Sequence, residues 1–202
     1  YSEGQKDLAL ANKIQMSSIP HRFPETDTLD MYALMEPAKE VGGDFYDYFR
    51  VKQNLTAFII ADVSDKGLPA ALFMMKAKGT FKSISMVENN PDRILTLVNR
   101  ELATDNVLEQ FVTAWIGLLD TDTGVLYYSN AGHTAPYIKR KNGSFSNLEN
   151  PKGLTMGIYE ISKFRTMETK LDDGDILFLY TDGVTEAFDK NNYQFGHERL
   201  LN

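Results

Sequence analysis

Three aspartates stand where the sequence passes between an apolar run and a glycine-containing loop. Asp62 follows the run Phe58–Ala61, Asp182 follows the run Ile176–Thr181, and Asp44 follows a pair of glycines. Aspartates at strand ends are often only turn or helix-cap residues, so each one alone indicates little. A layout that repeats three times favours a shared acidic site. Oxygen ligands without cysteine suit Mg²⁺ or Mn²⁺.

The spacing of the first two aspartates supports this interpretation. The runs 45–51 and 55–62 are predicted to be two strands joined by a polar turn at residues 52–54. With the turn centred on Gln53, Asp44 and Asp62 would lie opposite each other. Cross-strand partners have Cβ atoms about 4.5–5.5 Å apart, and like charges there are destabilising. Such a pair needs a basic partner, a shared proton or a cation. We expect a metal, and a proton-sharing pair is the alternative.

Composition narrows the classes of function. The chain has 202 residues, 28 Asp and Glu against 21 Lys and Arg, a net charge of −7 and no cysteine. The absence of cysteine excludes a disulfide scaffold, a cysteine zinc site and a thiolate nucleophile. The net negative charge argues against nucleic-acid binding, which normally needs a basic face. Most of the acids are expected to be solvated surface residues.

The remaining pattern predicts an α+β fold on antiparallel sheets, because strands joined by short turns alternate with only two inserted helices. An amphipathic helix is expected over 5–18, ended by Pro20 and Pro24, and a helix start is expected at His197. Asp172-Asp173-Gly174 predicts a hairpin turn between two of the later strands. Further helices are expected over 69–88 and 91–105, and further strands over 31–35, 111–119, 125–130, 136–140, 163–171 and 175–181.

Four ordered motifs and two pairs of residues in the leading helix carry a family resemblance. They are Val41–Asp47, Ala61–Leu72, Asn130–His133 and Tyr180–Ala187, with Ile14-Gln15 and Ile19-Pro20. In these motifs the sequence resembles the PPM-type protein phosphatases of the bacterial SpoIIE/RsbU group, over nearly its whole length. The resemblance implies a four-layer αββα sandwich, in which helices flank two antiparallel β-sheets. It also implies two Mn²⁺ or Mg²⁺ ions between the sheets.

The resemblance assigns roles residue by residue. Asp44 matches the first metal-binding carboxylate, and Asp62 matches the catalytic carboxylate that bridges both metals. Val63 matches the position that gives a backbone carbonyl, and Asp182 matches the later carboxylate. The group usually has a further Asp-Asp-x-Thr motif, so the last ligand is expected beyond Asn202. The role of His133 stays open between proton donation to the leaving group and a structural hydrogen bond.

The implied function is hydrolysis of phosphoserine or phosphothreonine on a protein by a metal-activated water. The implied substrate is a phosphorylated STAS-domain anti-sigma-factor antagonist, and the alternative is a metal-free pseudophosphatase that serves as a protein-binding module. We expect residues 1–24 to form a linker or regulatory helix, which could mediate a homodimer. Residues 25–202 are expected to form the phosphatase domain without its C-terminal end. No signal peptide or apolar membrane span is visible, so a cytoplasmic location is expected.

Overall fold

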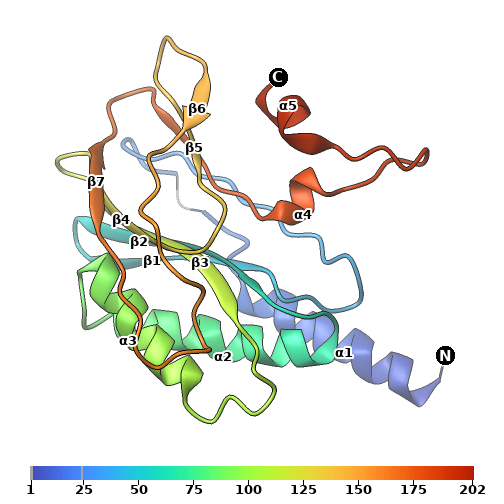
Figure 1. Ribbon diagram of the computed structural model, residues 1–202. Coiled ribbons are helices and arrows are strands. Elements are labelled where there is room, and N and C mark those ends of the chain that lie inside the picture. Colours follow the sequence, from blue (N-terminus) through green and yellow to red (C-terminus); the bar gives the residue numbers. More distant parts are fainter. Residues whose placement is uncertain (1, 24) are drawn as a thin grey trace.

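The computed structural model describes residues 2–23 and 25–202, so Pro24, one of the two expected helix-ending prolines, lies outside the described residues. Figure 1 shows two sheets stacked above a layer of helices. The helices are α1 (Glu3–Ser18), α2 (Leu68–Ser85), α3 (Pro91–Ala103), α4 (Asp182–Thr185) and α5 (Gly196–Leu201). The strands are β1 (Phe45–Lys52), β2 (Leu55–Val63), β3 (Val112–Asp120), β4 (Val125–Ala131), β5 (Tyr137–Lys139), β6 (Phe145–Asn147), β7 (Met167–Lys170) and β8 (Ile176–Phe178).

The strands form two antiparallel sheets. The larger sheet has the order β1-β2-β3-β4-β7, and the smaller has the order β6-β5-β8. Helices α2 and α3 cover the outer face of the larger sheet, and α1 packs against α2. The predicted α+β architecture of two antiparallel sheets flanked by helices is confirmed.

Two apolar cores hold these layers together. Alternation along β2 divides its side chains, with Ile59 and Ala61 packed toward the helices and Phe58 and Ile60 toward the smaller sheet. The smaller sheet contributes Ile138 to the second core. Because the centre of the larger sheet is buried on both faces, β2 and β3 read as nearly continuous apolar runs whose polar residues lie near the strand ends.

The predicted register of the first hairpin is confirmed. Phe45 pairs with Ala61, and the same register continues to Arg50 and Thr56. The turn lies at residues 53–54. Extended by one residue, this register places Asp44 opposite Asp62, as the sequence predicted.

Two other predictions about strands are wrong. Residues 31–35 have no strand partner, and Tyr32 and Leu34 are 82% and 69% exposed. The strand pattern in this segment therefore does not mark a face that packs on the core. The expected hairpin around Asp172-Asp173-Gly174 does not form, because β7 pairs with β4 in the larger sheet and β8 pairs with β5 in the smaller one.

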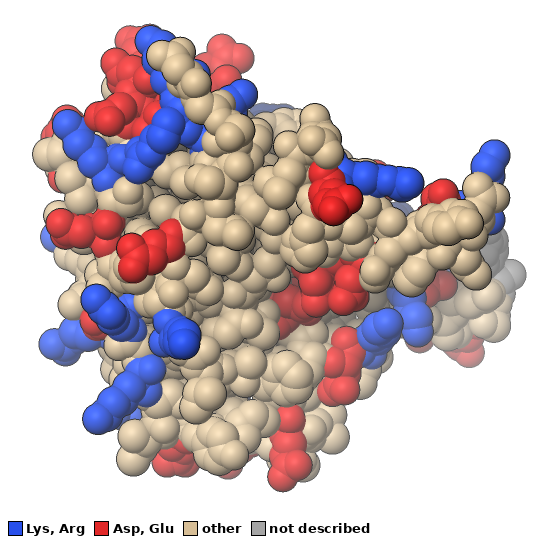
Figure 2. Space-filling model, turned by 45° about the horizontal axis from the view of Figure 1, so that its top comes forward, with Lys and Arg blue, Asp and Glu red and all other residues tan. Residues whose placement is uncertain are grey.

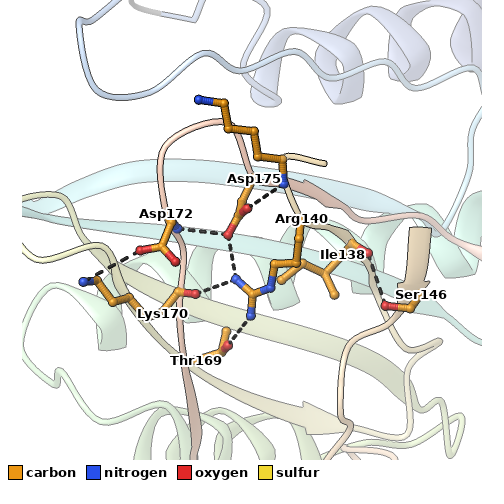
Figure 3. Close-up of polar contacts among 8 residues, drawn as sticks. Ile138, Arg140, Ser146, Thr169, Lys170, Asp172 and Asp175 are labelled. Atoms are coloured by element: carbon orange, nitrogen blue, oxygen red, sulfur yellow. Dashed lines mark hydrogen bonds and ion pairs between the residues drawn. The ribbon is translucent and has the colours of Figure 1, made fainter. Parts of the chain in front are cut away.

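The turn after β7 carries the chain from one sheet to the other, and a polar clip fixes it (Figure 3). The Asp175 carboxylate accepts hydrogen bonds from the Asp172 amide at 3.0 Å and the Lys141 amide at 3.1 Å. The Arg140 guanidinium lies 2.6 Å from Asp175 and also donates to the Lys170 carbonyl at 2.7 Å. Arg140, which directly follows β5 of the smaller sheet, is thereby bound to the end of β7 in the larger sheet.

We expect Asp175→Ala to lower the free energy of unfolding by about 1–2 kcal/mol, because two amides and Arg140 lose their acceptor. The amide of Asp172 and then Arg140 hold the pKa of Asp175 below its usual value. A lowered pKa stabilises the fold above the unfolded pKa of about 4, and this stabilisation is lost as the pH falls through the folded value. Urea unfolding at pH 7 and pH 3 should show a smaller difference from wild type at pH 3.

Asp173→Ala is the matched control, because Asp173 is an exposed residue of the same turn. It should unfold at the same urea concentration as wild type at both pH values. Equal stabilities of Asp175→Ala and Asp173→Ala would contradict a role of the clip in stability.

Candidate metal centre

The structure brings the three predicted aspartates together at one end of the sandwich. Asp44 immediately precedes β1, Asp62 is the last but one residue of β2, and Asp182 begins α4. The carboxyl group of Asp62 lies close enough to those of both Asp44 and Asp182 to interact with them by hydrogen bonding and by charge. Asp44 and Asp62 are half-buried, whereas Asp182 is exposed. In Figure 2, acidic side chains lie both around the rim and in a group nearer the middle of the face.

Burial, together with the hydrogen bonds and charges of Asp44 and Asp182, raises the pKa of Asp62 to about 8. At neutral pH Asp62 therefore favours its protonated form unless a cation is present. Both alternatives from the sequence, a proton-sharing pair and a metal, agree with this electrostatic arrangement.

The donor set fits a hard divalent cation, since it consists of carboxylate oxygens. Within residues 2–23 and 25–202, however, no three Asp, Glu, His or Cys side chains are arranged as a group that could hold a metal ion. Asp62 instead interacts with both other aspartates, and Asp44 Oδ2 accepts a hydrogen bond of 2.6 Å from Thr181 Oγ1. Metal ligation by Asp44, Asp62, Val63 and Asp182 stays a prediction.

Val63 lies against the glycine that precedes Asp44. The Val63 amide donates to the Gly43 carbonyl at 3.4 Å. A Cβ atom on Gly43 would lie 2.8 Å from the Val63 carbonyl oxygen, which is closer than real Cβ contacts. Only glycine therefore lets the two backbones approach, and the carbonyl expected to bind metal depends on that approach.

The loop before Asp44 is tied to α1 by Gln15, which is 2% exposed. Gln15 Nε2 donates to the Gly42 carbonyl at 2.6 Å, and the Gly42 amide donates to Gln15 Oε1 at 3.0 Å. The leading helix thus contacts the loop that carries an expected ligand. The division of the chain at residue 24 stays a prediction.

Two threonines that lie near the aspartates were not predicted from the sequence as site residues. Thr181 stands within a motif that carries the resemblance, but its bond to Asp44 spans 137 residues. Thr113 pairs with Asp62 across β2 and β3 and contacts the ring of His133. No local pattern marks either contact, because both depend on pairing between distant strands.

Comparisons with known proteins agree with this arrangement. The family model described as stage II sporulation protein E (SpoIIE) matches residues 52–202. The chain is 30% identical over 192 residues to phosphoserine phosphatase RsbU of Bacillus subtilis (strain 168), covering 95% of this chain and 57% of that protein. It is 25% identical over 186 residues to phosphoserine phosphatase RsbP of the same organism, covering 90% and 46%. The chain thus spans about half the length of these two relatives.

Solved structures share the fold. The SiaA-PP2C domain of Pseudomonas aeruginosa has a TM-score of 0.80 at 23% identity, covering 100% of this chain and 82% of that one. The PP2C phosphatase domain of SpoIIE from Bacillus subtilis, solved with a regulatory fragment, has a TM-score of 0.61 at 22% identity, covering 72% and 42%. The fold is therefore that of a PP2C-type phosphatase domain. With three quarters of its length matched by the family model, the chain belongs to the SpoIIE family.

None of the helices in the described part of the chain is long and apolar enough to cross a membrane.

We expect Gly43→Ala to abolish Mn²⁺ binding measured by isothermal titration calorimetry, because the new Cβ would displace the Val63 carbonyl. Gly42→Ala is the matched control, since its Cβ would meet Pro37 at an ordinary 3.6 Å. Gly42→Ala should bind Mn²⁺ like wild type. Equal binding by the two variants would contradict the role given to the close approach.

We also expect Asp62→Asn to stabilise the protein in the presence of a chelator, because it removes one charge from the cluster. Asp62 is only half-buried, so solvent screens part of the repulsion. A gain of about 1 kcal/mol would raise Tm by roughly 2–4 °C. A raised pKa costs the wild type stability as the pH rises from about 4 toward 8.

Calorimetric scans of wild type and Asp62→Asn should therefore differ at pH 8 and converge near pH 4. A lower Tm for Asp62→Asn at pH 8 would contradict net repulsion at the site.

Proposed function

We propose that this chain is a metal-dependent protein serine/threonine phosphatase domain that hydrolyses phosphoserine or phosphothreonine on a protein. The observation that carries the proposal is the contact of Asp62 with both Asp44 and Asp182 at one end of a PP2C-type sandwich. Relatives named phosphoserine phosphatases, RsbU and RsbP, support it. A structural neighbour, RsbX, was solved in complex with magnesium, which supports a divalent cation.

Asp44, Asp62, the Val63 carbonyl and Asp182 would hold two Mn²⁺ or Mg²⁺ ions. Such ions, when bound, lower the pKa of a water toward neutrality and offset the charge of the phosphoryl group. Asp62 interacts with both other aspartates, which supports its proposed role as the carboxylate that would serve both ions. Thr181 orients Asp44 by its hydrogen bond.

The position of the aspartates suits a protein substrate. Asp182 is exposed on the surface, so a phosphorylated side chain on a folded protein can reach the site without entering a deep cavity. Structural neighbours include the RsbU and RsbW domains of a Mycobacterium tuberculosis protein and a bacterial stressosome component. The substrate class that we propose, a phosphorylated STAS-domain anti-sigma-factor antagonist, is the one that the sequence resemblance implies.

Two further expectations about partners and location stay predictions. Leu10 and Ile14 of α1 are 59% and 56% exposed, which agrees with a homodimer through this helix. A cytoplasmic location is in keeping with a signalling substrate of this class.

A metal-free pseudophosphatase is the second candidate function. It is favoured by one observation, the absence from the described residues of three acidic, histidine or cysteine side chains arranged to hold a metal ion. In that case the surface around the aspartates would bind a protein partner without hydrolysis. Metal binding separates the two candidates.

The deciding assay measures phosphate release from a phosphoserine-containing STAS-domain protein with Mn²⁺ and with a chelator. We expect activity only with Mn²⁺, and a loss of at least about 100-fold in Asp62→Asn. Asp122→Asn, at an exposed turn beyond the opposite end of β3, is the control and should retain wild-type activity. A chelator-resistant rate, or full activity in Asp62→Asn, would overturn the two-metal mechanism. Absence of Mn²⁺ binding by calorimetry would favour the pseudophosphatase.

A further inference from the structure

The ring of His133 lies between Thr113 of β3 and Tyr180 in the segment before Asp182, and both of its nitrogens are engaged. The residue is 6% exposed. Its Nδ1 lies 2.9 Å from Thr113 Oγ1, and its Nε2 lies 3.0 Å from the Tyr180 carbonyl oxygen. A carbonyl oxygen can only accept, so Nε2 carries a proton and donates it in this hydrogen bond. In the neutral ring, Nδ1 then accepts from the Thr113 hydroxyl.

The backbone around His133 holds the ring in this orientation. The His133 amide donates to Asn130 Oδ1 at 2.7 Å, and Asn130 Nδ2 donates to the His133 carbonyl at 3.0 Å. Gly132 has φ of +68°, a conformation that favours glycine and turns the chain out of β4. Asn130 and Gly132, from the same motif, thus hold the backbone that carries the imidazole of His133.

This arrangement does not suit a general acid. Proton donation to a leaving seryl oxygen requires a ring nitrogen that can reach the substrate. Here one nitrogen is bound to Tyr180 and the other to Thr113, and the ring is almost fully buried. Burial lowers the pKa of His133, although the Tyr180 carbonyl and the charges of Asp44 and Asp182 oppose that shift.

Thr113 and Tyr180, the two hydrogen-bond partners of the His133 ring, both lie near aspartates of the site. Thr113 pairs with Asp62 in the β2–β3 ladder. Tyr180 stands between the end of β8 and Asp182, in a segment that belongs to no strand or helix. The next residue, Thr181, donates to Asp44. A hydrogen bond to the Tyr180 carbonyl therefore fixes the peptide unit between Tyr180 and Thr181, which directly precedes the Thr181 hydroxyl and lies one residue before Asp182.

We propose that His133 is a positioning residue: its imidazole links the β3 neighbour of Asp62 to the segment before Asp182, and thereby sets the spacing of these two carboxylates and the affinity for metal. The proposal rests on the metal-dependent function proposed above. His133 acts through Tyr180 and Thr113 and has no contact with the reacting groups.

The test compares His133→Ala, which removes both hydrogen bonds, with His133→Gln, whose Nε2 can still donate to the Tyr180 carbonyl. Isothermal titration calorimetry with Mn²⁺ alone gives the affinity of each variant. We expect the Kd to rise about 10–100-fold in His133→Ala and to recover toward wild type in His133→Gln. His21→Gln is the control, since His21 also contacts a backbone carbonyl but is exposed on the segment after α1. Its Kd should equal that of wild type.

A second measurement separates positioning from proton donation. p-Nitrophenyl phosphate has a leaving group that needs no proton, whereas phosphoserine does. At a fixed Mn²⁺ concentration, a positioning role predicts that His133→Ala loses activity on both substrates in the same ratio. Loss on a phosphoserine protein with retention on p-nitrophenyl phosphate would overturn the proposal in favour of a general acid.

Two results keep this inference apart from the proposed function. If wild type binds Mn²⁺ and His133→Ala binds it with equal affinity, only the positioning role is overturned. If wild type binds no Mn²⁺, the proposed function is overturned and this inference with it.

Circular dichroism checks that the variants fold. If His133→Ala does not fold, Thr113→Val provides the test, because valine keeps the shape of the threonine side chain and lacks only its hydroxyl. We expect a Kd a few-fold higher there, and an unchanged value would overturn the proposal.

Discussion

The mutual repulsion of three carboxylates at one end of the sandwich is the constraint on which the rest of the structure depends. Asp44, Asp62 and Asp182 come from three separate segments and meet in a half-buried place where water screens their charges only in part. Left to themselves, the charges would move apart or be neutralised by a proton. Their proximity is therefore imposed by the fold, and the fold must supply the free energy that holds them together.

The fold supplies it through rigid layers and a few long-range contacts. The register of β1 with β2 sets Asp44 opposite Asp62, and apolar packing on both faces of the larger sheet prevents that register from shifting. Asp182 arrives from the smaller sheet, so its position depends on how the two sheets are joined. The polar clip at Arg140 fixes one end of that junction, and the ring of His133 fixes the other.

The difference between local and long-range contacts explains which features could be predicted from the sequence. The first hairpin was predicted in register because its turn and its alternating apolar residues are local. The second predicted hairpin was wrong, since Asp172-Asp173-Gly174 indicates a turn but not which strand lies beside the next one. Strands β7 and β8 find partners far away in the sequence, and only the assembled sheets decide this. The same limit hid Thr113 and Thr181, whose neighbours at the site are 51 and 137 residues distant.

Asp62 and Asp175 show how the surroundings of an acid, rather than its type, decide its role. Both are aspartates at strand ends. Asp175 accepts from amides and an arginine, which lowers its pKa and makes its charge stabilising. Asp62 is half-buried and faces other carboxyl groups, and burial first and these neighbours second raise its pKa and make its charge costly. The acidic residues therefore include compensated ones such as Asp175 and a small uncompensated group around Asp62. The uncompensated group is where a divalent cation would gain most, because it would replace repulsion among neighbours by attraction to a common centre.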